Sequence, residues 1–291
     1  MRGDKSSLTP GTPVCERAQV RRTEVSELDS FVFPQQHSWK EVMRAARTKK
    51  YDIITAQDPF WRGLLAWRAA RSTGARLNLQ VHTDLSALPL PRQLLAYFLL
   101  KRADSIRVVS VQLKNFLTAF LHPKAVISVL PVHIALERYR NVSYTKHQRF
   151  AKTILWIGRF EDEKDPRTAL AVLREVRKAV DAGLVMLEDG SMHNAILKEA
   201  KPLMPFVEFA GWKDPLPYLS QADVVLCTSR HESYGASMVE ALAAGVAVVA
   251  PDVGVAREAG ARVVPRSELG KAVVDVLSAG ERGTLLLTFD S

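Results

Sequence analysis

The sequence predicts an α/β protein made of two units, each built on a parallel sheet. From Phe31 onward, short apolar runs alternate with segments of helical apolar periodicity. Such alternation is typical of parallel sheets with crossover helices. A polar stretch over residues 132–150, without clear apolar periodicity, interrupts the alternation. The length of 291 residues also suits two domains of ordinary size.

In the first unit, apolar runs that end at proline or at polar turns predict strands, and helical periodicity predicts the helices between them. Residues 1–13 are rich in turn formers and predict a loop. Residues 14–27 favour a helix, although residues 20–25 also suit a strand. The further expected strands are residues 30–33, 51–55, 77–81, 105–109 and 125–130, and the expected helices are residues 39–48, 60–72, 94–102 and 111–121.

In the second unit both patterns resume, and Pro166 suits the first turn of a helix. The expected strands are residues 153–157, 184–187, 206–209, 222–227 and 246–250, and the expected helices are residues 166–180, 216–221, 236–244 and 267–277. We therefore assign residues 1–135 to an N-terminal domain, residues 136–150 to a linker and residues 151–291 to a C-terminal domain.

The most informative stretch is the predicted strand, loop and helix over residues 222–244. The loop contains Gly235, and the first N–H groups of the following helix have no partner inside that helix. Because these groups and the helix dipole favour negative charge, the stretch predicts an anion site. Glu232 lies on the loop and Glu240 lies eight residues later, inside the helix. One carboxylate would therefore meet each end of a bound ligand.

Two carboxylates beside an anion site suit a ligand that carries hydroxyl groups as well as phosphates. An ionised carboxylate accepts two hydroxyl hydrogen bonds, as the diol of a ribose or of a sugar would offer. The pattern therefore predicts a nucleotide-sugar pocket, with ribose on Glu240, donor sugar on Glu232 and phosphates on backbone amides. For such a pair taken alone, two solvated surface glutamates are the alternative.

Four ordered motifs over residues 153–265 resemble those of retaining GT-B glycosyltransferases, especially glycosyltransferase family 4. The spacing of Glu232 and Glu240 matches the E-x7-E signature of that family. Residues 157–164 (IGRFEDEK), 209–212 (FAGW) and 251–258 (PDVGVARE) are similar to its V-G-R-L-x-x-E-K, F-x-G and T-D-V-G-G-x-x-E motifs. The resemblance implies two Rossmann-like domains facing each other across a cleft, the first on the acceptor side and the second binding the nucleotide sugar.

The resemblance also implies the chemistry, which is transfer of a sugar from a nucleotide diphosphate to an acceptor hydroxyl with retained anomeric configuration. The acceptor would be a glycan, a lipid or a small molecule, and neither a metal nor another cofactor would take part. Arg159 and Lys164 would neutralise the pyrophosphate as it leaves. Glu232 and the backbone of Tyr234 and Gly235 would hold the donor sugar and phosphate. Glu240 would bind the ribose.

His82 follows the predicted strand 77–81, at the strand end where parallel sheets bind ligands. A lone histidine is more often structural, but the resemblance implies that His82 faces the donor sugar near the reacting carbon. Asp58 and Asp84 lie in similar turns and are candidate acceptor contacts. The alternative for both is a turn residue that caps the next helix.

Three features depart from the family pattern. Glu188 stands where the family has the first glycine of a G-x-G motif, and only Gly190 remains. The family opens with a strand before a glycine-bearing loop, and few residues precede Gly3 and Gly11. The family also ends in helices that cross back to the first domain, whereas this chain ends at Ser291. We therefore expect a chain shortened at both ends.

Composition narrows the classes of partner. The net charge is +9, and Arg44, Arg47, Lys49 and Lys50 form the densest basic cluster, on or beside the expected helix 39–48 and without an interleaved aromatic pattern that would stack on bases. This disfavours nucleic acid as a partner and leaves two readings of the cluster, peripheral contact with an anionic membrane or a solvated helix face. The N-terminus lacks the apolar region of a signal peptide, which predicts a cytoplasmic location, and peripheral contact would then be with the inner face of the membrane. Cys15 and Cys227 suggest no disulfide framework.

Two other functions stay open at this point. The substitution at Glu188 and the short ends suit a catalytically inactive GT-B-like binding or partner protein. A dinucleotide-dependent oxidoreductase would share the sheets, but no G-x-G-x-x-G follows a predicted strand.

Overall fold

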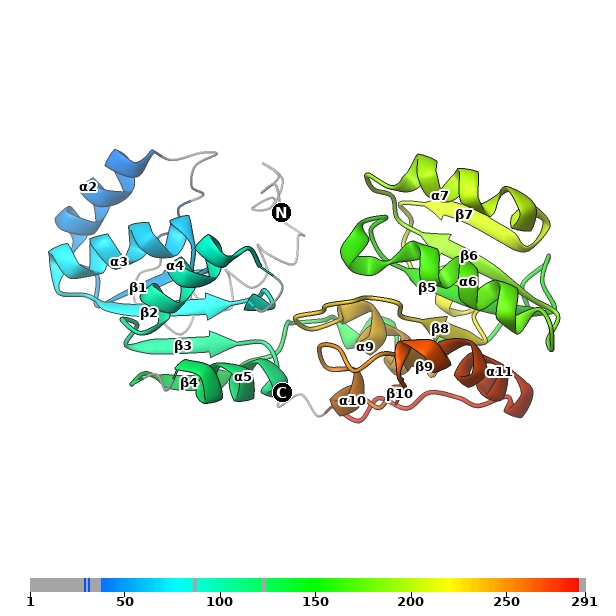
Figure 1. Ribbon diagram of the computed structural model, residues 1–291. Helices are drawn as coiled ribbons and strands as arrows, with labels where there is room; N and C mark the ends of the chain where they lie inside the picture. The colour runs from blue at the N-terminus through cyan, green and yellow to red at the C-terminus, as the bar shows by residue number, and fades with distance from the viewer. Residues whose placement is uncertain (1–28, 30, 32–37, 86–87, 122–123, 288–291) are drawn as a thin grey trace. The chain divides into compact units, whose positions relative to one another are not determined.

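The computed structural model describes residues 29, 31, 38–85, 88–121 and 124–287, and it contains two open sheets flanked by helices (Figure 1). The chain divides into two compact units. One unit holds most of the first sheet and the other holds the whole second sheet. The elements expected over residues 1–13 and 14–27, and that over residues 30–33 apart from Phe31, lie outside the described residues.

The first sheet has the strand order β1-β2-β3-β4, and β1 pairs with β2 in parallel. Helix α2 begins at a capping box in which Ser38 and Glu41 bond each other's backbone N–H groups. Helix α3 ends at Gly74, whose φ of 77° suits glycine. The elements are α2 (Trp39–Lys49), β1 (Ile53–Ala56), α3 (Trp61–Thr73), β2 (Arg76–Val81), α4 (Leu90–Leu100), β3 (Ser105–Val108), α5 (Val111–Leu121) and β4 (Val126–Val129).

The core of this first sheet comes from its central strands and from the helices that cover them. Leu77 and Leu79 of β2 and Ile106 of β3 are fully buried, as are Leu99 of α4 and Leu117 of α5. Helix α3 packs on β1 and β2, and α2 packs on α3 (Figure 1). None of the helices in the described part of the chain is both long and apolar enough to cross a membrane.

The second sheet has the order β10-β9-β8-β5-β6-β7, and all five neighbouring pairs are parallel. Counted along the chain, this is the order 6-5-4-1-2-3 of a doubly wound nucleotide-binding fold. The order reverses between β5 and β8, and ligands bind such sheets beyond the strand ends at that point. The strands are β5 (Lys152–Ile157), β6 (Ala182–Leu187), β7 (Val207–Gly211), β8 (Val224–Leu226), β9 (Ala247–Ala250) and β10 (Arg262–Val263).

Apolar residues of the strands and of three helices form one core on this second sheet. It includes Trp156 of β5, Leu173 of α6, Ile196 of α7 and Val273 of α11. The helices are α6 (Pro166–Val176), α7 (His193–Ala200), α8 (Leu216–Leu219), α9 (Ala236–Ala243), α10 (Ala256–Ala259) and α11 (Leu269–Ala279), and the 3-10 turns are η3 (Leu136–Arg138), η4 (Asp162–Lys164), η5 (Lys201–Phe206) and η6 (Arg266–Glu268).

The differences from the predicted elements have simple causes. Helix α6 ends at Val176 rather than at residue 180, because β6 begins at Ala182 and the chain needs the intervening residues to turn back. Helix α4 begins four residues before its predicted start, with Pro91 in its first turn. The short elements α7, α10 and β10 were not predicted, since two to eight residues carry little periodicity.

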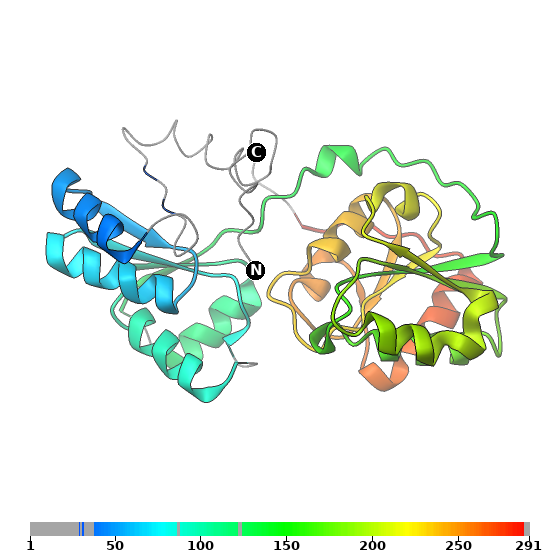
Figure 2. The same ribbon diagram turned by 90° about the horizontal axis from the view of Figure 1, so that it is seen from above.

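The polar stretch before β5 is irregular apart from η3, as Figure 2 shows. It is not wholly exposed, because Leu136 and Tyr139 are buried.

Candidate functional site

The candidate site lies where β5 and β8 end, at the reversal of strand order in the second sheet. Residues 158–165 leave β5 and lead through η4 into α6, and residues 227–235 leave β8 and lead into α9. Five of the predicted site residues lie on these two loops: Arg159, Lys164, Glu232, Tyr234 and Gly235. The topology therefore brings together two motifs that are about 70 residues apart in the sequence, as the spacing of Lys164 and Glu232 shows.

Helix α9 presents an open N-terminus to this site. Gly235 precedes the helix with a φ of 91°, a left-handed conformation that strains other residues, and no side chain caps the helix. The first N–H groups of α9 can therefore bind an anion. The Tyr234 side chain is buried, so the predicted contact of Tyr234 with a ligand would be through its backbone, and this contact stays a prediction.

The loop before α9 is fixed by a second glycine. Gly254 approaches so closely that a Cβ atom there would lie 2.4 Å from the Tyr234 carbonyl oxygen. The N–H of Val255 donates to the same carbonyl oxygen at 2.9 Å. Residues 251–254, predicted to be a turn that supports the pocket wall, thus hold the backbone of the loop from outside.

Lys164 and Glu232, predicted to bind opposite parts of the donor, form an ion pair across the two loops. Both side chains are largely buried, and the Ser229 hydroxyl donates to the same Glu232 oxygen at 2.8 Å. A partly desolvated ion pair is stronger than an exposed one. The pair therefore balances the charge of Glu232 before any ligand binds.

Arg159 is more accessible than Lys164. Its side chain is about half exposed and pairs with Glu163 of the same loop, which is itself half exposed. Exposed pairs of this kind contribute little to stability, so the guanidinium can exchange Glu163 for a phosphate at small energetic cost.

Glu240 lies in a different environment, on the inner part of α9. Burial raises the pKa of Glu240 to about 7, although a hydrogen bond from the Tyr139 hydroxyl and the charge of Arg138 act in the opposite direction. Burial, together with the charge of Glu240, raises the pKa of Tyr139 to about 12. Sequence reasoning missed Tyr139, because it lies in the stretch assigned to a linker.

A buried polar network lies beneath the two loops. The Thr228 hydroxyl accepts from the Trp156 indole N–H at 2.8 Å and lies 2.8 Å from the Lys164 carbonyl oxygen. Arg266 donates to the Thr228 carbonyl at 2.6 Å and pairs with Asp165, which caps α6. Arg266 thus joins the end of β8 to the start of α6, and no local signal in the sequence identifies it.

The loop after β6 is joined to the loop after β5. A Cβ atom on Gly190 would lie 2.7 Å from the Phe160 carbonyl oxygen, and the Phe160 N–H donates to the Asp189 carbonyl at 3.1 Å. Glu161 accepts from the Ser191 backbone and hydroxyl. Gly190 is therefore required for close packing, whereas Glu188 takes a left-handed φ of 77° that usually favours glycine.

Three predicted residues, His82, Asp58 and Asp84, follow strands of the first sheet. His82 is half-buried directly after β2, and its role at the reaction centre stays a prediction. Asp58 accepts from the Phe60 N–H at 3.0 Å and pairs with Arg62, which favours its reading as a turn residue before α3. Asp84 lies near the end of the same polar turn as His82, and its role as an acceptor contact also stays a prediction.

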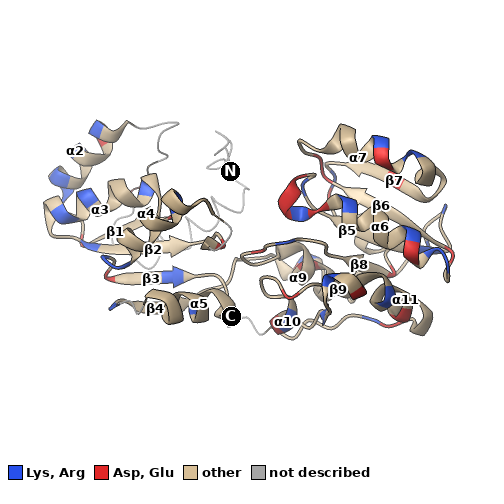
Figure 3. Cartoon of the chain, in the orientation of Figure 1, with Lys and Arg blue, Asp and Glu red and all other residues tan. Residues whose placement is uncertain are grey.

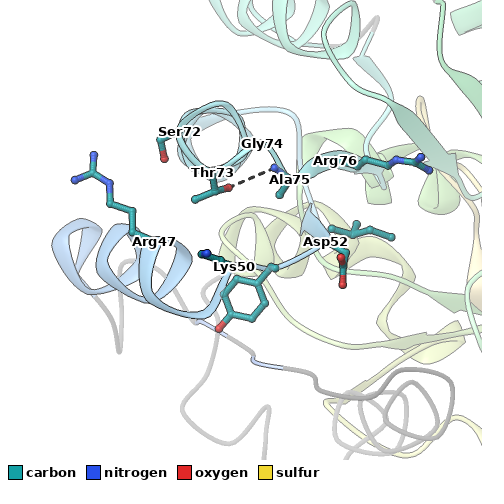
Figure 4. A pocket seen from close by; sticks show the side chains of 10 residues that line it. Arg47, Lys50, Asp52, Ser72, Thr73, Gly74, Ala75 and Arg76 are labelled. Carbon is teal, nitrogen blue, oxygen red and sulfur yellow. Dashed lines mark hydrogen bonds between the residues drawn. The ribbon is translucent and has the colours of Figure 1, made fainter.

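A hollow of about 790 Å³ in the first unit is not the predicted site. It lies at the start of β1 and β2, between α2 and the end of α3, which is the opposite strand end from His82 (Figure 4). Figure 4 shows Arg47 and Arg76 at its two sides, with their guanidinium groups directed apart. The hollow therefore offers no converging set of charges.

Helix α2, the predicted basic helix, carries exposed cations along its length (Figure 3). Glu41 is its acidic residue and belongs to the N-terminal capping box. The basic residues are Lys40, Arg44, Arg47 and Lys49. The arrangement is compatible with both readings of this helix, a solvated face and a membrane-facing one.

Two family models match this chain. The model described as glycosyl transferases group 1 matches residues 151–279, and the model described as glycosyl transferase 4-like domain matches residues 7–133.

The chain is similar to curated proteins that transfer sugars. It is 25% identical to N-acetyl-alpha-D-glucosaminyl L-malate synthase of Bacillus anthracis, over 74% of this chain and 60% of that protein. It is 25% identical to glycogen synthase of Mycobacterium tuberculosis, over 84% of this chain and 61% of that protein. A phosphatidyl-myo-inositol mannosyltransferase of the same organism is 32% identical over 44% of this chain and 34% of that protein. The chain thus spans less than two thirds of the length of these relatives.

Solved structures show the same fold at lower identity. Sucrose-phosphate synthase from Thermosynechococcus elongatus superposes with a TM-score of 0.68 at 18% identity, covering 85% of this chain and 72% of that one. HepE of Anabaena, solved with UDP, superposes with a TM-score of 0.66 at 15% identity, covering 83% and 77%. These likenesses establish the two-domain α/β fold predicted from the sequence.

Proposed function

The chain belongs to the GT-B glycosyltransferases, and from this premise we propose that it transfers a sugar from a nucleotide diphosphate to an acceptor hydroxyl with retention of anomeric configuration. One observation carries this proposal. Cations, carboxylates and the first N–H groups of α9 lie together beyond the ends of β5 and β8, where the strand order of the second sheet reverses. Lys164 and Glu232 come from the two loops, and Glu240 follows on α9.

Each group suits one part of such a donor. Lys164, Arg159 and the first N–H groups of α9 bind the diphosphate and stabilise the charge that it gains as it leaves. Glu232 accepts from the donor sugar hydroxyls once Lys164 turns to the phosphate. Glu240 accepts from the ribose hydroxyls.

In the proposed reaction the acceptor oxygen bonds to the anomeric carbon on the face from which the diphosphate oxygen departs. The departing phosphate oxygen takes the acceptor proton, so no carboxylate nucleophile is required. His82 is proposed to face the reacting carbon and to orient the sugar. The names of the comparison proteins contain malate, glycogen and phosphatidyl-myo-inositol, three different chemical classes, so they do not narrow the acceptor class.

A thermal-shift screen of nucleotide sugars tests the donor assignment. A ligand that binds only the folded state raises the unfolding midpoint, and a tighter ligand raises it more. We expect one donor family to stabilise the wild type and to lose most of this effect in Glu240→Ala. Glu199→Ala, which changes an exposed glutamate of α7, is the matched control. Equal stabilisation of wild type and Glu240→Ala would show that Glu240 does not bind the ribose.

The stabilising donor is then incubated with candidate acceptors, and the anomeric configuration of the product is read by NMR. Transfer with retention supports the proposal, and transfer with inversion contradicts it. Donor binding without turnover against any acceptor class would favour the inactive binding protein instead.

A further inference from the structure

Glu188 lies beside the proposed diphosphate site without having been assigned a part in it. The register of β5 and β6 pairs Ile157 with Leu187, so Glu188 lies next to Gly158, where the cationic loop begins. The Glu188 N–H donates to the Gly211 carbonyl of β7 at 2.8 Å. This bond and its left-handed φ of 77° fix the backbone from which the carboxylate extends.

The charges that act on Glu188 are those of the proposed donor site. Burial raises the pKa of Glu188 above its usual range; the charges of Lys164 and Arg159 act in the opposite direction, and the charge of Glu232 adds to the effect of burial. The charge of Glu188 in turn disfavours ionisation of Glu240. Among the described residues, the Glu188 carboxylate has neither an ion-pair nor a hydrogen-bond partner. It is therefore a carboxylate without a direct partner, whose charge interacts with those of Lys164, Arg159 and Glu240.

We propose that Glu188 makes the site select the nucleotide sugar over the spent nucleoside diphosphate, an inference that rests on the proposed function. Both diphosphates are repelled by the carboxylate, but they are not repelled equally. In the nucleotide sugar the second phosphate is esterified, whereas in the product it is a terminal phosphate whose second proton has a pKa of about 6. At pH 7.5 the product therefore carries about one more negative charge, on the phosphate nearest to the reacting carbon.

The expected size of this discrimination follows from Coulomb's law. Two unit charges about 10 Å apart, at the effective dielectric constant of a protein surface, change a dissociation constant by about tenfold. The consequence is faster release of the product and weaker product inhibition than the cations alone would allow.

The test measures dissociation constants by titration calorimetry for three pairs, UDP with UDP-glucose, GDP with GDP-mannose and ADP with ADP-glucose. The proteins are the wild type, Glu188→Gln, Glu188→Gly and the control Asp181→Asn. Asp181 lies at the opposite end of β6, about 20 Å away along the strand and beyond the screening length, so its charge should not act on the site. Asp181→Asn removes one negative charge, as Glu188→Gln does. The Gln variant keeps the side-chain shape, and the Gly variant removes any strain of the left-handed backbone.

For the pair that the wild type binds, both Glu188 variants should tighten the product about tenfold more than the sugar, and Asp181→Asn should change neither. This difference should shrink in high salt. Equal tightening of product and sugar, or no change, would overturn the inference while leaving the proposed function intact. Loss of affinity for the sugar alone in Glu188→Gln would also overturn it, because the carboxylate would then bind the sugar. Absence of binding of every pair to the wild type would overturn the proposed function itself.

Discussion

Glu232 and Glu240 lie on one continuous loop and helix, yet the two ends of this stretch differ in how they hold a carboxylate. Glu232 is paired with Lys164 and accepts from the Ser229 hydroxyl. Glu240 has no cation in direct contact in the described structure, and burial raises its pKa to about 7. Two carboxylates of one motif are thus placed in opposite environments, a pattern by which proteins separate the roles of like groups.

The loop end, with Glu232, and the helix end, with Glu240, should therefore respond differently to a ligand. At the loop end a ligand replaces an existing ion pair, so the charge of the site is balanced before and after binding. At the helix end, hydroxyl groups that donate to Glu240 favour its ionised form. Binding near pH 6 should therefore release a proton from Glu240.

Removing the cation of the loop end should have the largest effect. Lys164→Met leaves Glu232 unpaired and the leaving diphosphate without its buried cation, so kcat/KM for transfer should fall by about 100-fold or more. Lys164→Arg should retain part of the activity, and Lys178→Met, on an exposed position after α6, should retain all of it. Steady-state kinetics with the donor found in the screen measures the effect. Full activity of Lys164→Met would mean that this lysine does not contact the diphosphate.

The next largest effect should come from removing Arg266 from the buried network beneath the loop end, and it should be seen in the free energy of unfolding. Arg266→Ala removes one of the partners of Asp165 and the donor to the Thr228 carbonyl, and should lower the free energy of unfolding by about 2–3 kcal/mol. Arg262→Ala is the matched control, because Arg262 pairs with two exposed carboxylates and should contribute less than about 1 kcal/mol. Urea unfolding of both variants provides the comparison. Similar losses in both would show that the buried network is no stronger than a surface pair.

The helix end predicts a pH dependence of stability. Because the pKa of Glu240 is higher in the folded protein than in the unfolded chain, the folded state binds the proton more tightly. The contribution of Glu240 to the free energy of unfolding is therefore fully present below about pH 4.5 and is lost as the pH rises through about 7, by on the order of 2–3 kcal/mol. Glu240→Gln should abolish this part of the pH dependence and be the more stable protein at pH 8. Unfolding curves at pH 5 and pH 8 measure the free energy of unfolding of the wild type and of Glu240→Gln. An equal change between the two pH values in both proteins would contradict the prediction.

The smallest expected difference between a variant and its control concerns the packing of the loop. Gly254 and Gly280 both have positive φ, so alanine at either should cost about 1 kcal/mol. At Gly254 the new Cβ would also meet the Tyr234 carbonyl, and we expect about 1–2 kcal/mol more and a raised KM for the donor. At Gly280 a Cβ meets nothing. Equal stability of the two variants would show that the loop moves aside without penalty.

The parts of the fold and site that could be predicted share a local origin. The apolar runs of β5 and β8 and the glycine before α9 are visible in short windows of sequence, so the loops that bear Arg159, Lys164 and Glu232 were predicted where they occur. The meeting of Lys164 with Glu232 follows from topology, since strands on the two sides of a reversal place their ends together.

The residues that were missed act across long sequence separations. Arg266 pairs with Asp165, 101 residues earlier, and Thr228 receives its hydrogen bond from Trp156, 72 residues earlier. Tyr139 comes from a polar stretch without periodicity, where burial of a single side chain has no pattern to reveal it. Patterns in the sequence report which face of an element is buried, but not which distant polar group that face will meet.

Trp156, which donates a hydrogen bond to Thr228, is also an internal fluorophore. Its indole is buried at the end of β5, whereas Trp39, Trp61 and Trp212 are exposed to water. Emission from Trp156 should therefore lie at shorter wavelength than emission from these three, and it should respond when the Thr228 hydroxyl shifts. Occupancy of the neighbouring loops can thus be followed optically in the unlabelled chain, on the time scale of a stopped-flow experiment.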